Sequence, residues 1–266
     1  MKIGTKDFDL QNNAYIMGIL NVTPDSFSDG GKFYQRDCAL KQAEQLILDG
    51  ADILDIGGES TRPNHTFVSA EEEMERVLPI IEQVKKNFDI PISLDTYKSQ
   101  VAEEGIKAGV DLINDVWGLK WDGTMAQVIG KYQIPTCIMH NRKDTNYTNF
   151  IENVLDDLRE SLELAKNAGA DMSKIMVDPG IGFVKTYEQN LYMMKHLERL
   201  LELSYPVLLA TSRKSMIGLT LDLPPSEREE GTIATTVLGY MKGCSIFRVH
   251  DVKKNKRALQ MIQAMS

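Results

Sequence analysis

Short aliphatic runs recur along the chain, and segments with helical periodicity separate each run from the next. The runs cover residues 15–20, 53–56, 92–94, 112–114, 135–139, 175–177, 207–210 and 246–249. They are apolar at successive positions instead of alternating, which is typical of parallel strands that helices cover from outside. The pattern therefore predicts an α/β protein with eight buried strands.

The segments between the runs place their apolar residues on one helical face. Two examples are the sets Ala70, Met74, Val77, Leu78, Ile81, Val84 and Ile151, Val154, Leu155, Leu158, Leu162, Ala165. Ser69 and Glu72 have the spacing of a capping box at the start of the first helix. Gly50, Gly109 and Gly169 follow helical segments, where a left-handed residue commonly ends a helix.

Strict alternation of strand and helix, repeated eight times in 266 residues, predicts a single (β/α)8 TIM barrel. An open, doubly wound parallel sheet is the competing architecture. We find no linker rich in proline, serine or glycine and no block of charge that would divide the chain. We therefore expect residues 1–266 to form one domain.

Polar residues gather directly after the strands and hardly at all before them. The segments are 21–31, 57–63, 95–96, 114–115, 140–141, 178–183, 211–215 and 248–251. Taken singly, Asp95, Asn114 or Asp178 has the ordinary explanation of a helix cap, and Lys214 that of a solvated charge. In a barrel, however, these segments meet at the face that carries active sites. Their joint placement favours a common site.

The chemistry of these residues indicates a heterocycle and an anion as ligands. Three short acceptor side chains, Asp95, Asn114 and Asp178, suit a flat ring with several N–H donors, such as a 2-amino-4-oxo-pterin. Cationic side chains gather in the same region and suit a phosphate: Arg62, Arg213, Lys214, Arg248 and His250. Asn21 fits a Mg2+ held mostly by diphosphate oxygens and water, with Asp29 as a second candidate.

Composition narrows the class of protein further. A formal net charge of -8 argues against nonspecific binding to nucleic acid or anionic membranes, because both require a basic surface. The first residues lack the apolar run of a signal peptide, and no apolar stretch approaches membrane-spanning length, so we expect a cytoplasmic protein. Cys38, Cys137 and Cys244 show neither zinc-ligand spacing nor a disulfide framework, and we interpret them as packing residues.

Six motifs, taken in order, resemble those of the dihydropteroate synthases, and they extend over nearly the whole chain. They are Gly18-Ile19-Leu20-Asn21-Val22-Thr23-Pro24-Asp25-Ser26-Phe27-Ser28-Asp29-Gly30-Gly31, Gly57-Gly58-Glu59-Ser60-Thr61-Arg62-Pro63, Asn114-Asp115-Val116, Asp178-Pro179-Gly180, Ser212-Arg213-Lys214-Ser215 and Arg248-Val249-His250-Asp251-Val252. One departure from the family pattern is Asn64, where glycine usually follows Pro63. Asparagine tolerates the left-handed conformation, so we expect the turn to form.

The resemblance implies an enzyme that joins (7,8-dihydropterin-6-yl)methyl diphosphate to p-aminobenzoate, releasing pyrophosphate, with Mg2+ as cofactor and a homodimer as assembly. It also implies roles for individual residues. The pterin is held by Asp95, Asn114, Met139, Asp178 and Lys214, and the diphosphate by Thr61, Arg62, Arg248 and His250. The p-aminobenzoate is held by Phe27, Pro63, Phe183, Arg213 and Ser215, the metal by Asn21, and catalysis falls to Lys214, Asp29 and Arg248.

Two other functions share part of this pattern. Barrels that bind methyltetrahydrofolate and pass its methyl group to a corrinoid protein need the acceptors but not the cationic cluster. A non-catalytic pterin-binding protein would not need Asn21 or Lys214. The chain carries both features, which favours the synthase.

Overall fold

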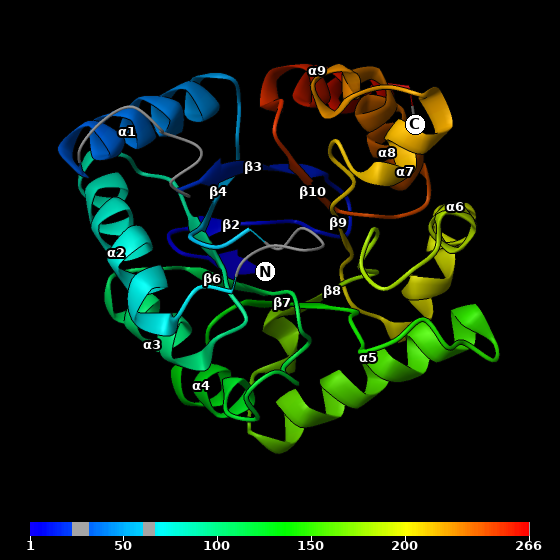
Figure 1. Cartoon of the computed structure of the whole chain (residues 1–266), viewed down its shortest axis with the longest axis horizontal. Helices are drawn as coiled ribbons and strands as arrows, with labels where there is room; N and C mark the ends of the chain where they lie inside the picture. Colours follow the sequence, from blue (N-terminus) through cyan, green and yellow to red (C-terminus); the bar gives the residue numbers. More distant parts are fainter. Residues whose placement is uncertain (23–31, 61–66, 266) are drawn as a thin grey trace.

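The computed structural model describes residues 1–22, 32–60 and 67–265, and within them eight parallel strands form one sheet. The strands are β3 (Tyr15–Asn21), β4 (Ile53–Gly57), β5 (Ile92–Asp95), β6 (Leu112–Asp115), β7 (Thr136–Met139), β8 (Ile175–Asp178), β9 (Leu208–Leu209) and β10 (Ile246–Val249). The sheet runs in the order β8-β7-β6-β5-β4-β3-β10-β9, and a parallel bridge between Val177 and Val207 joins its two edges. The predicted (β/α)8 barrel is confirmed, and the open sheet is wrong (Figure 1).

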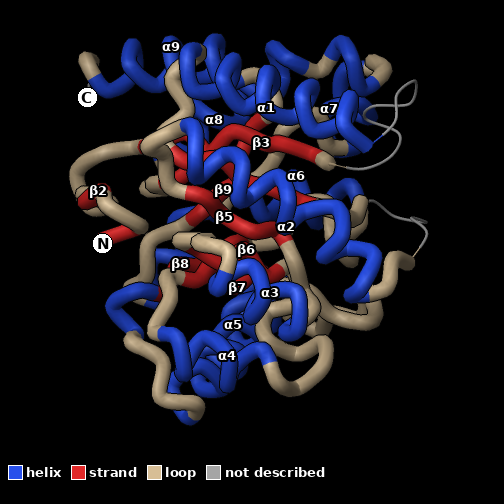
Figure 2. Tube along the Cα trace, turned by 90° about the vertical axis from the view of Figure 1, so that its left-hand side faces the viewer, coloured by secondary structure: helices blue, strands red, loops and turns tan. Residues whose placement is uncertain are grey.

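Helices surround the barrel and connect successive strands (Figures 1 and 2). They are α1 (Lys32–Leu48), α2 (Ala70–Asn87), α3 (Ser99–Lys107), α4 (Met125–Tyr132), α5 (Phe150–Asn167), α6 (Tyr187–Lys195), α7 (Ser215–Leu221), α8 (Glu229–Met241) and α9 (Val252–Gln263), with 3-10 turns η2 (Met172–Lys174), η3 (Leu197–Leu203) and η4 (Pro225–Glu227). The backbone N–H of Glu72 donates to Ser69 Oγ at the start of α2, as the sequence predicts. A reciprocal capping box, which we did not predict, starts α6 at Thr186 and Gln189.

Apolar burial follows the predicted helical faces. All six predicted residues of α5 are buried, together with Ser161. In α2, Val77, Ile81 and Val84 are buried, and Ala70, Met74 and Leu78 pack against the same core from partly exposed positions. Gly50, Gly109 and Gly169 have φ values of +100°, +104° and +78°, which confirms that they occupy left-handed positions after helices.

An antiparallel hairpin of β1 (Lys2–Ile3) and β2 (Lys6–Asp7) precedes the barrel and is absent from the predicted elements. Ile3, Phe8 and Leu10 pack against residues of the strands that line the barrel interior. These residues are Met17, Ile53, Leu112, Cys137, Met176, Leu208 and Ile246 on the strands, and Ala210 directly after β9. Figure 2 shows the hairpin at the end of the barrel where the strands begin. The hairpin therefore forms an apolar floor beneath the barrel.

Two predictions from composition also have a structural outcome. Cys38, Cys137 and Cys244 are free thiols, and the latter two are buried in the core. Among the helices that the structure describes, none has both the length and the apolar character needed to cross a membrane.

Candidate active site

A cavity of about 640 Å³ opens at the carboxyl ends of the strands. Each of the eight barrel strands, or the loop that follows it, contributes residues to its lining. Its lining is Ile19, Asn21, Glu59, Ser60, Asp95, Asn114, Val116, Met139, Asp178, Gly182, Phe183, Ala210, Ser212, Arg213, Lys214, Ser215, Pro225, Arg228, Arg248 and His250. The mixture of apolar walls and convergent polar groups is typical of a small-molecule site.

The three predicted acceptors lie together in this cavity and are buried. Asp95 on β5 is in register with Asn114 on β6, and Asp178 ends β8 beside Met139 on β7. Their exposed fractions are 7%, 3% and 2%, so each can hold a ligand in a water-poor environment. One Asp178 oxygen, Oδ1, accepts a 2.6 Å hydrogen bond from the backbone N–H of Gly180. Burial raises the pKa of Asp178, while Lys214 and the Gly180 N–H oppose that shift.

Arg248 bridges two carboxylates at the bottom of the cavity. Its Nε donates to Asp55 Oδ2 and its Nη2 donates to Asp95 Oδ2, each over 2.6 Å. Within the described residues, the other oxygen of each aspartate is buried without a partner. Burial raises the pKa of Asp95 to about 7, with Arg248 opposing the shift and Asp55 adding to it. The prediction placed Arg248 against an anionic ligand, whereas here its guanidinium is held by the protein's own carboxylates.

Lys214 approaches the cavity from the start of α7 and is half-buried. Its Nζ donates to the backbone carbonyl of Ile181 and lies 4.9 Å from the centroid of the Phe183 ring. Burial lowers the pKa of Lys214 to about 8, while Asp178 and Asp95 act in the opposite direction. The ammonium group therefore sits between the acceptor pocket and an aromatic wall.

The turn between β9 and α7 presents Arg213 and Ser215 at the exposed rim of the cavity. Arg213 has a φ of +57°, a conformation that costs energy for a residue with a side chain. Thr232 and Arg228 hold this backbone, because the Arg213 N–H donates to Thr232 Oγ1 and Arg228 Nη1 donates to the Arg213 carbonyl. The turn is thus fixed by Thr232 in α8 and by Arg228, which directly precedes α8.

His250 is oriented by the same turn. Its backbone N–H donates to Ser212 Oγ over 3.1 Å, and Ser212 Oγ lies 2.9 Å from His250 Nδ1. Because the serine oxygen accepts from the backbone, its hydroxyl proton is available to Nδ1. Ser212 therefore fixes both the backbone and the ring of His250.

A buried ion cluster supports the loop that follows β4. Lys98 Nζ donates to Glu59 Oε2 and, over 2.5 Å, to Glu73 Oε2. Glu59 also accepts from the Tyr97 hydroxyl and from the backbone N–H of Val68. The side chains of Lys98, Glu59 and Glu73 are 7%, 3% and 1% exposed. We call these three residues the Lys98 cluster.

Several predicted site residues lie outside the described residues. They are Phe27, Asp29, Thr61, Arg62 and Pro63, together with the departure at Asn64. Of the remaining predicted residues, each lines the cavity: Asn21, Asp95, Asn114, Met139, Asp178, Phe183, Arg213, Lys214, Ser215, Arg248 and His250. In the described part of the chain, no group of three or more His, Cys, Asp or Glu side chains could hold a metal by itself.

Sequence reasoning missed Asp55, Glu59 and Arg228. Asp55 carried a usable signal, because it is a charged residue inside the apolar run of β4 and must therefore be paired. Glu59 stands within a motif that we quoted but received no role. Arg228 gave no signal, since it follows a 3-10 turn far along the chain from the residues it supports.

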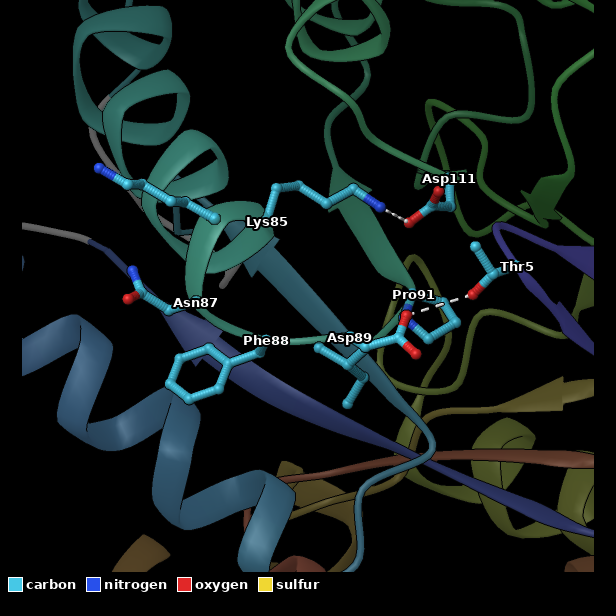
Figure 3. Close-up of a pocket in the computed structure, with 9 residues that line it drawn as sticks. Thr5, Lys85, Asn87, Phe88, Asp89, Pro91 and Asp111 are labelled. Atoms are coloured by element: carbon cyan, nitrogen blue, oxygen red, sulfur yellow. Dashed lines mark hydrogen bonds and ion pairs between the residues drawn. The ribbon is translucent and has the colours of Figure 1, made fainter.

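A second hollow, of about 320 Å³, lies at the opposite end of the barrel, beside the start of β5 (Figure 3). Lys85 at the end of α2 points toward Asp111, with Nζ 2.6 Å from Oδ2, and Thr5 Oγ1 donates to Asp89 over 3.3 Å. Asp111 also accepts from the backbone N–H of Ile92. These polar groups bond to one another, so we interpret the hollow as a place where α2, the hairpin and the start of β5 are held together.

The chain matches the model of one protein family, described as pterin binding enzyme, over residues 17–250. That match spans most of the barrel and includes every residue that lines the cavity.

Similar proteins named dihydropteroate synthase match nearly the full length of the chain. A dihydropteroate synthase from Clostridium beijerinckii is 59% identical over 98% of this chain and 97% of its own length. A solved dihydropteroate synthase from Clostridium difficile, in the presence of pteroic acid, has a TM-score of 0.95 and 53% identity, covering 97% of this chain and 99% of that one. The Xanthomonas albilineans enzyme with 4-aminobenzoic acid has a TM-score of 0.92 and 40% identity, covering 96% and 94%.

Proposed function

The chain belongs to the pterin binding enzyme family and to its dihydropteroate synthases, and we propose that the residues of the cavity catalyse the dihydropteroate synthase reaction. The reaction joins (7,8-dihydropterin-6-yl)methyl diphosphate to p-aminobenzoate and gives 7,8-dihydropteroate and pyrophosphate. A bond from the methylene carbon to a diphosphate oxygen breaks, and a bond from that carbon to the arylamine nitrogen forms. The observation that carries the assignment is the buried acceptor set at the bottom of the cavity.

Asp95, Asn114 and Asp178 would hold the pterin ring with Lys214 and Met139. Buried carboxylate and amide oxygens accept from the amino-pyrimidine N–H groups, and paired hydrogen bonds fix the orientation of the ring. The Met139 side chain and Val116 provide an apolar wall beside them. When the leaving group departs, these acceptors stabilise the positive charge that develops on the pterin.

The p-aminobenzoate would lie nearer the rim, against Phe183, Arg213 and Ser215, with Phe27 and Pro63 from loops outside the described residues. The Xanthomonas albilineans structure with 4-aminobenzoic acid supports a site for this substrate in the same fold. Arg213 and the backbone N–H groups at the start of α7 suit the carboxylate. That orientation directs the amino group toward the pterin methylene carbon.

The diphosphate would face His250 and Arg248, with Thr61 and Arg62 from a loop that is not described. Asp55 and Asp95 offset the charge of Arg248, so its attraction for an anion increases when Asp95 is protonated. Of the proposed catalytic residues, Lys214 and Arg248 reach the cavity, and Asp29 stays a proposal from sequence.

Mg2+ is the cofactor that we propose, with Asn21 as its protein ligand. Asn21 ends β3 at the cavity, and no acidic or histidine cluster competes with it among the described residues. This single amide donor fits a metal that takes most of its ligands from the substrate. When bound, the ion would neutralise charge on the departing diphosphate. We further propose that residues 1–266 act as one domain, in the cytoplasm, as a homodimer.

The test is turnover of the purified protein with both substrates and Mg2+, following pyrophosphate release and dihydropteroate formation. Lys214→Ala and Asp95→Ala should each lower kcat/KM by about 100-fold or more, because each removes a group placed at developing charge. A chelator should abolish turnover, and added Mg2+ should restore it. Lys195→Ala, at an exposed position on α6, should retain activity. Binding of the pterin without release of pyrophosphate by the wild type would overturn the proposal.

A further inference from the structure

Three side chains form a hydrogen-bonded chain behind the loop that follows β8, and all three lie outside the cavity lining. Lys185 Nζ is 2.7 Å from His140 Nδ1, and His140 Nε2 is 2.9 Å from Asp157 Oδ2. His140 follows β7, Asp157 belongs to α5, and Lys185 precedes α6. The chain therefore ties three neighbouring elements together on the outer side of one cavity wall.

The hydrogen bonds determine where the protons lie. The Asp157 carboxylate can only accept, so the proton of a neutral His140 ring sits on Nε2 and points to Asp157, and Nδ1 accepts from Lys185. Burial, reinforced by the charge of Lys185, lowers the pKa of His140 to about 4, in agreement with a neutral ring. His140 thus acts as a rigid spacer that aims Lys185.

Lys185 in turn holds the backbone of the loop. Its Nζ donates to the Gly180 carbonyl over 3.0 Å and to the Phe183 carbonyl over 3.2 Å, and His140 Nδ1 is its third partner. Between them and α6 stands Val184, with a φ of +44° that a β-branched residue rarely adopts. The Tyr147 hydroxyl donates to the Val184 carbonyl over 3.0 Å. The loop is therefore kept in an unfavourable conformation by groups around it.

The same loop carries the aromatic wall of the cavity. On the cavity side, Lys214 Nζ donates to the Ile181 carbonyl and faces the Phe183 ring. Two lysines consequently hold residues 180–183 from opposite sides, Lys214 from within the cavity and Lys185 from behind it. Any release of the Gly180 and Phe183 carbonyls would change the separation between the Phe183 ring and the Lys214 ammonium group.

We propose that Lys185, aimed by His140 and Asp157, is a positioning residue that sets the Phe183–Lys214 wall for the arylamine substrate. This inference rests on the proposed function, which places p-aminobenzoate against Phe183. Asp95 and Asn114 are held by other strands, whereas Asp178 bonds Gly180 in the same loop, so the pterin pocket should depend on Lys185 in part, and less than the arylamine site does.

The experiment compares Lys185→Met with the wild type in steady-state turnover and in direct binding of a pterin that lacks the diphosphate. Methionine keeps most of the length of the side chain but donates no hydrogen bond. We expect the KM for p-aminobenzoate to rise about 10-fold, in line with loss of charge-assisted hydrogen bonds, while the Kd for the pterin rises by a clearly smaller factor. Asp157→Ala leaves Lys185 in place but unaimed, and should raise the same KM by a smaller factor.

Lys195→Met, an exposed lysine on α6, is the matched control and should change neither constant. An unchanged KM in Lys185→Met, or equal losses of arylamine and pterin binding, would overturn the inference and leave the synthase assignment intact. If Lys185→Met does not fold, Asp157→Ala decides the question by the same comparison. A wild type that makes no dihydropteroate would instead remove the proposed function and this inference with it.

Discussion

Two buried carboxylates and one guanidinium group meet at the bottom of the cavity. Asp55 and Asp95 share one guanidinium, that of Arg248, and each retains a buried oxygen without a partner among the described residues. An unsatisfied buried acceptor is costly, and such groups persist where a ligand completes them. The free oxygen of Asp95 is therefore well suited to a pterin N–H donor.

Proton release should accompany pterin binding below neutral pH. The pKa of Asp95 is raised to about 7 by burial, so at pH 6 the empty site holds this carboxyl mostly protonated. Donation from the pterin favours the carboxylate, which lowers the pKa and expels the proton. Calorimetry at pH 6 in two buffers of different ionisation enthalpy should show this release, and Asp95→Asn should abolish it.

A matched control exists for that measurement. Burial also raises the pKa of Asp115 to about 7, but its carboxylate accepts from the backbone N–H groups of Trp117 and Leu119 and does not line the cavity. Asp115→Asn should still release the proton. Equal release by wild type and Asp95→Asn would show that another group titrates.

The sequence predicted much of the site at this scale, because polar residues that end buried strands have few other places to go. It could not predict that Arg248 is held by Asp55 and Asp95, since pairing across strands depends on the register of β4, β5 and β10. Nor could it predict the chain from Lys185 to Asp157, whose members are ordinary loop and helix residues 17 to 45 positions apart.

At the scale of elements, hydrophobic pattern located the strands to within one or two residues. Four strands extend one residue further than the run, to a polar residue: β3 to Asn21, β5 to Asp95, β6 to Asp115 and β8 to Asp178. The run 207–210 is shorter in the structure, because Leu208–Leu209 alone forms a strand while Val207 makes the bridge that closes the barrel. The hairpin of β1 and β2 escaped prediction because two-residue strands with charged side chains have no recognisable period.

Elements around the loop after β4 depend on the Lys98 cluster, because Lys98 starts α3 and bonds Glu73 of α2. Lys98→Met should lower the free energy of unfolding by about 3–5 kcal/mol, since it removes a buried cation that contacts two buried carboxylates. Urea denaturation at pH 7 measures this change. Adding Glu59→Gln and Glu73→Gln to that variant should restore part of the loss.

Lys86→Met provides the comparison, since Lys86 is an exposed lysine on α2. We expect a change within about 0.5 kcal/mol for it. A loss below about 1 kcal/mol for Lys98→Met would mean that Glu59 and Glu73 take up protons or reach water at little cost.

On the scale of the whole molecule, an acidic chain directs anionic substrates to one mouth. The formal net charge is -8, yet Arg213, Lys214, Arg228, Arg248 and His250 gather at the cavity. Repulsion elsewhere on the surface and attraction at the mouth both favour capture there.

Large apolar side chains on α7 and α8 lie exposed on one side of the barrel, where Figure 1 places these helices together. Leu219 and Met241 are 65% and 69% exposed, and covering them in an interface would remove apolar surface from water. We predict a homodimer through this side. Sedimentation equilibrium should give twice the chain mass, and Leu219→Glu with Met241→Glu should shift it toward the monomer. A monomeric wild type at micromolar concentration would refute the prediction.

The apolar floor made by Ile3, Phe8 and Leu10 fills the barrel at the end where the strands begin, opposite the cavity at their carboxyl ends. Two ligands that enter through the same mouth at different depths bind in a fixed order. The pterin, whose proposed acceptors lie deepest, has to enter before the arylamine that would sit above it at the rim. Release follows the reverse order, so the ligand at the rim determines how long the pterin beneath it stays bound.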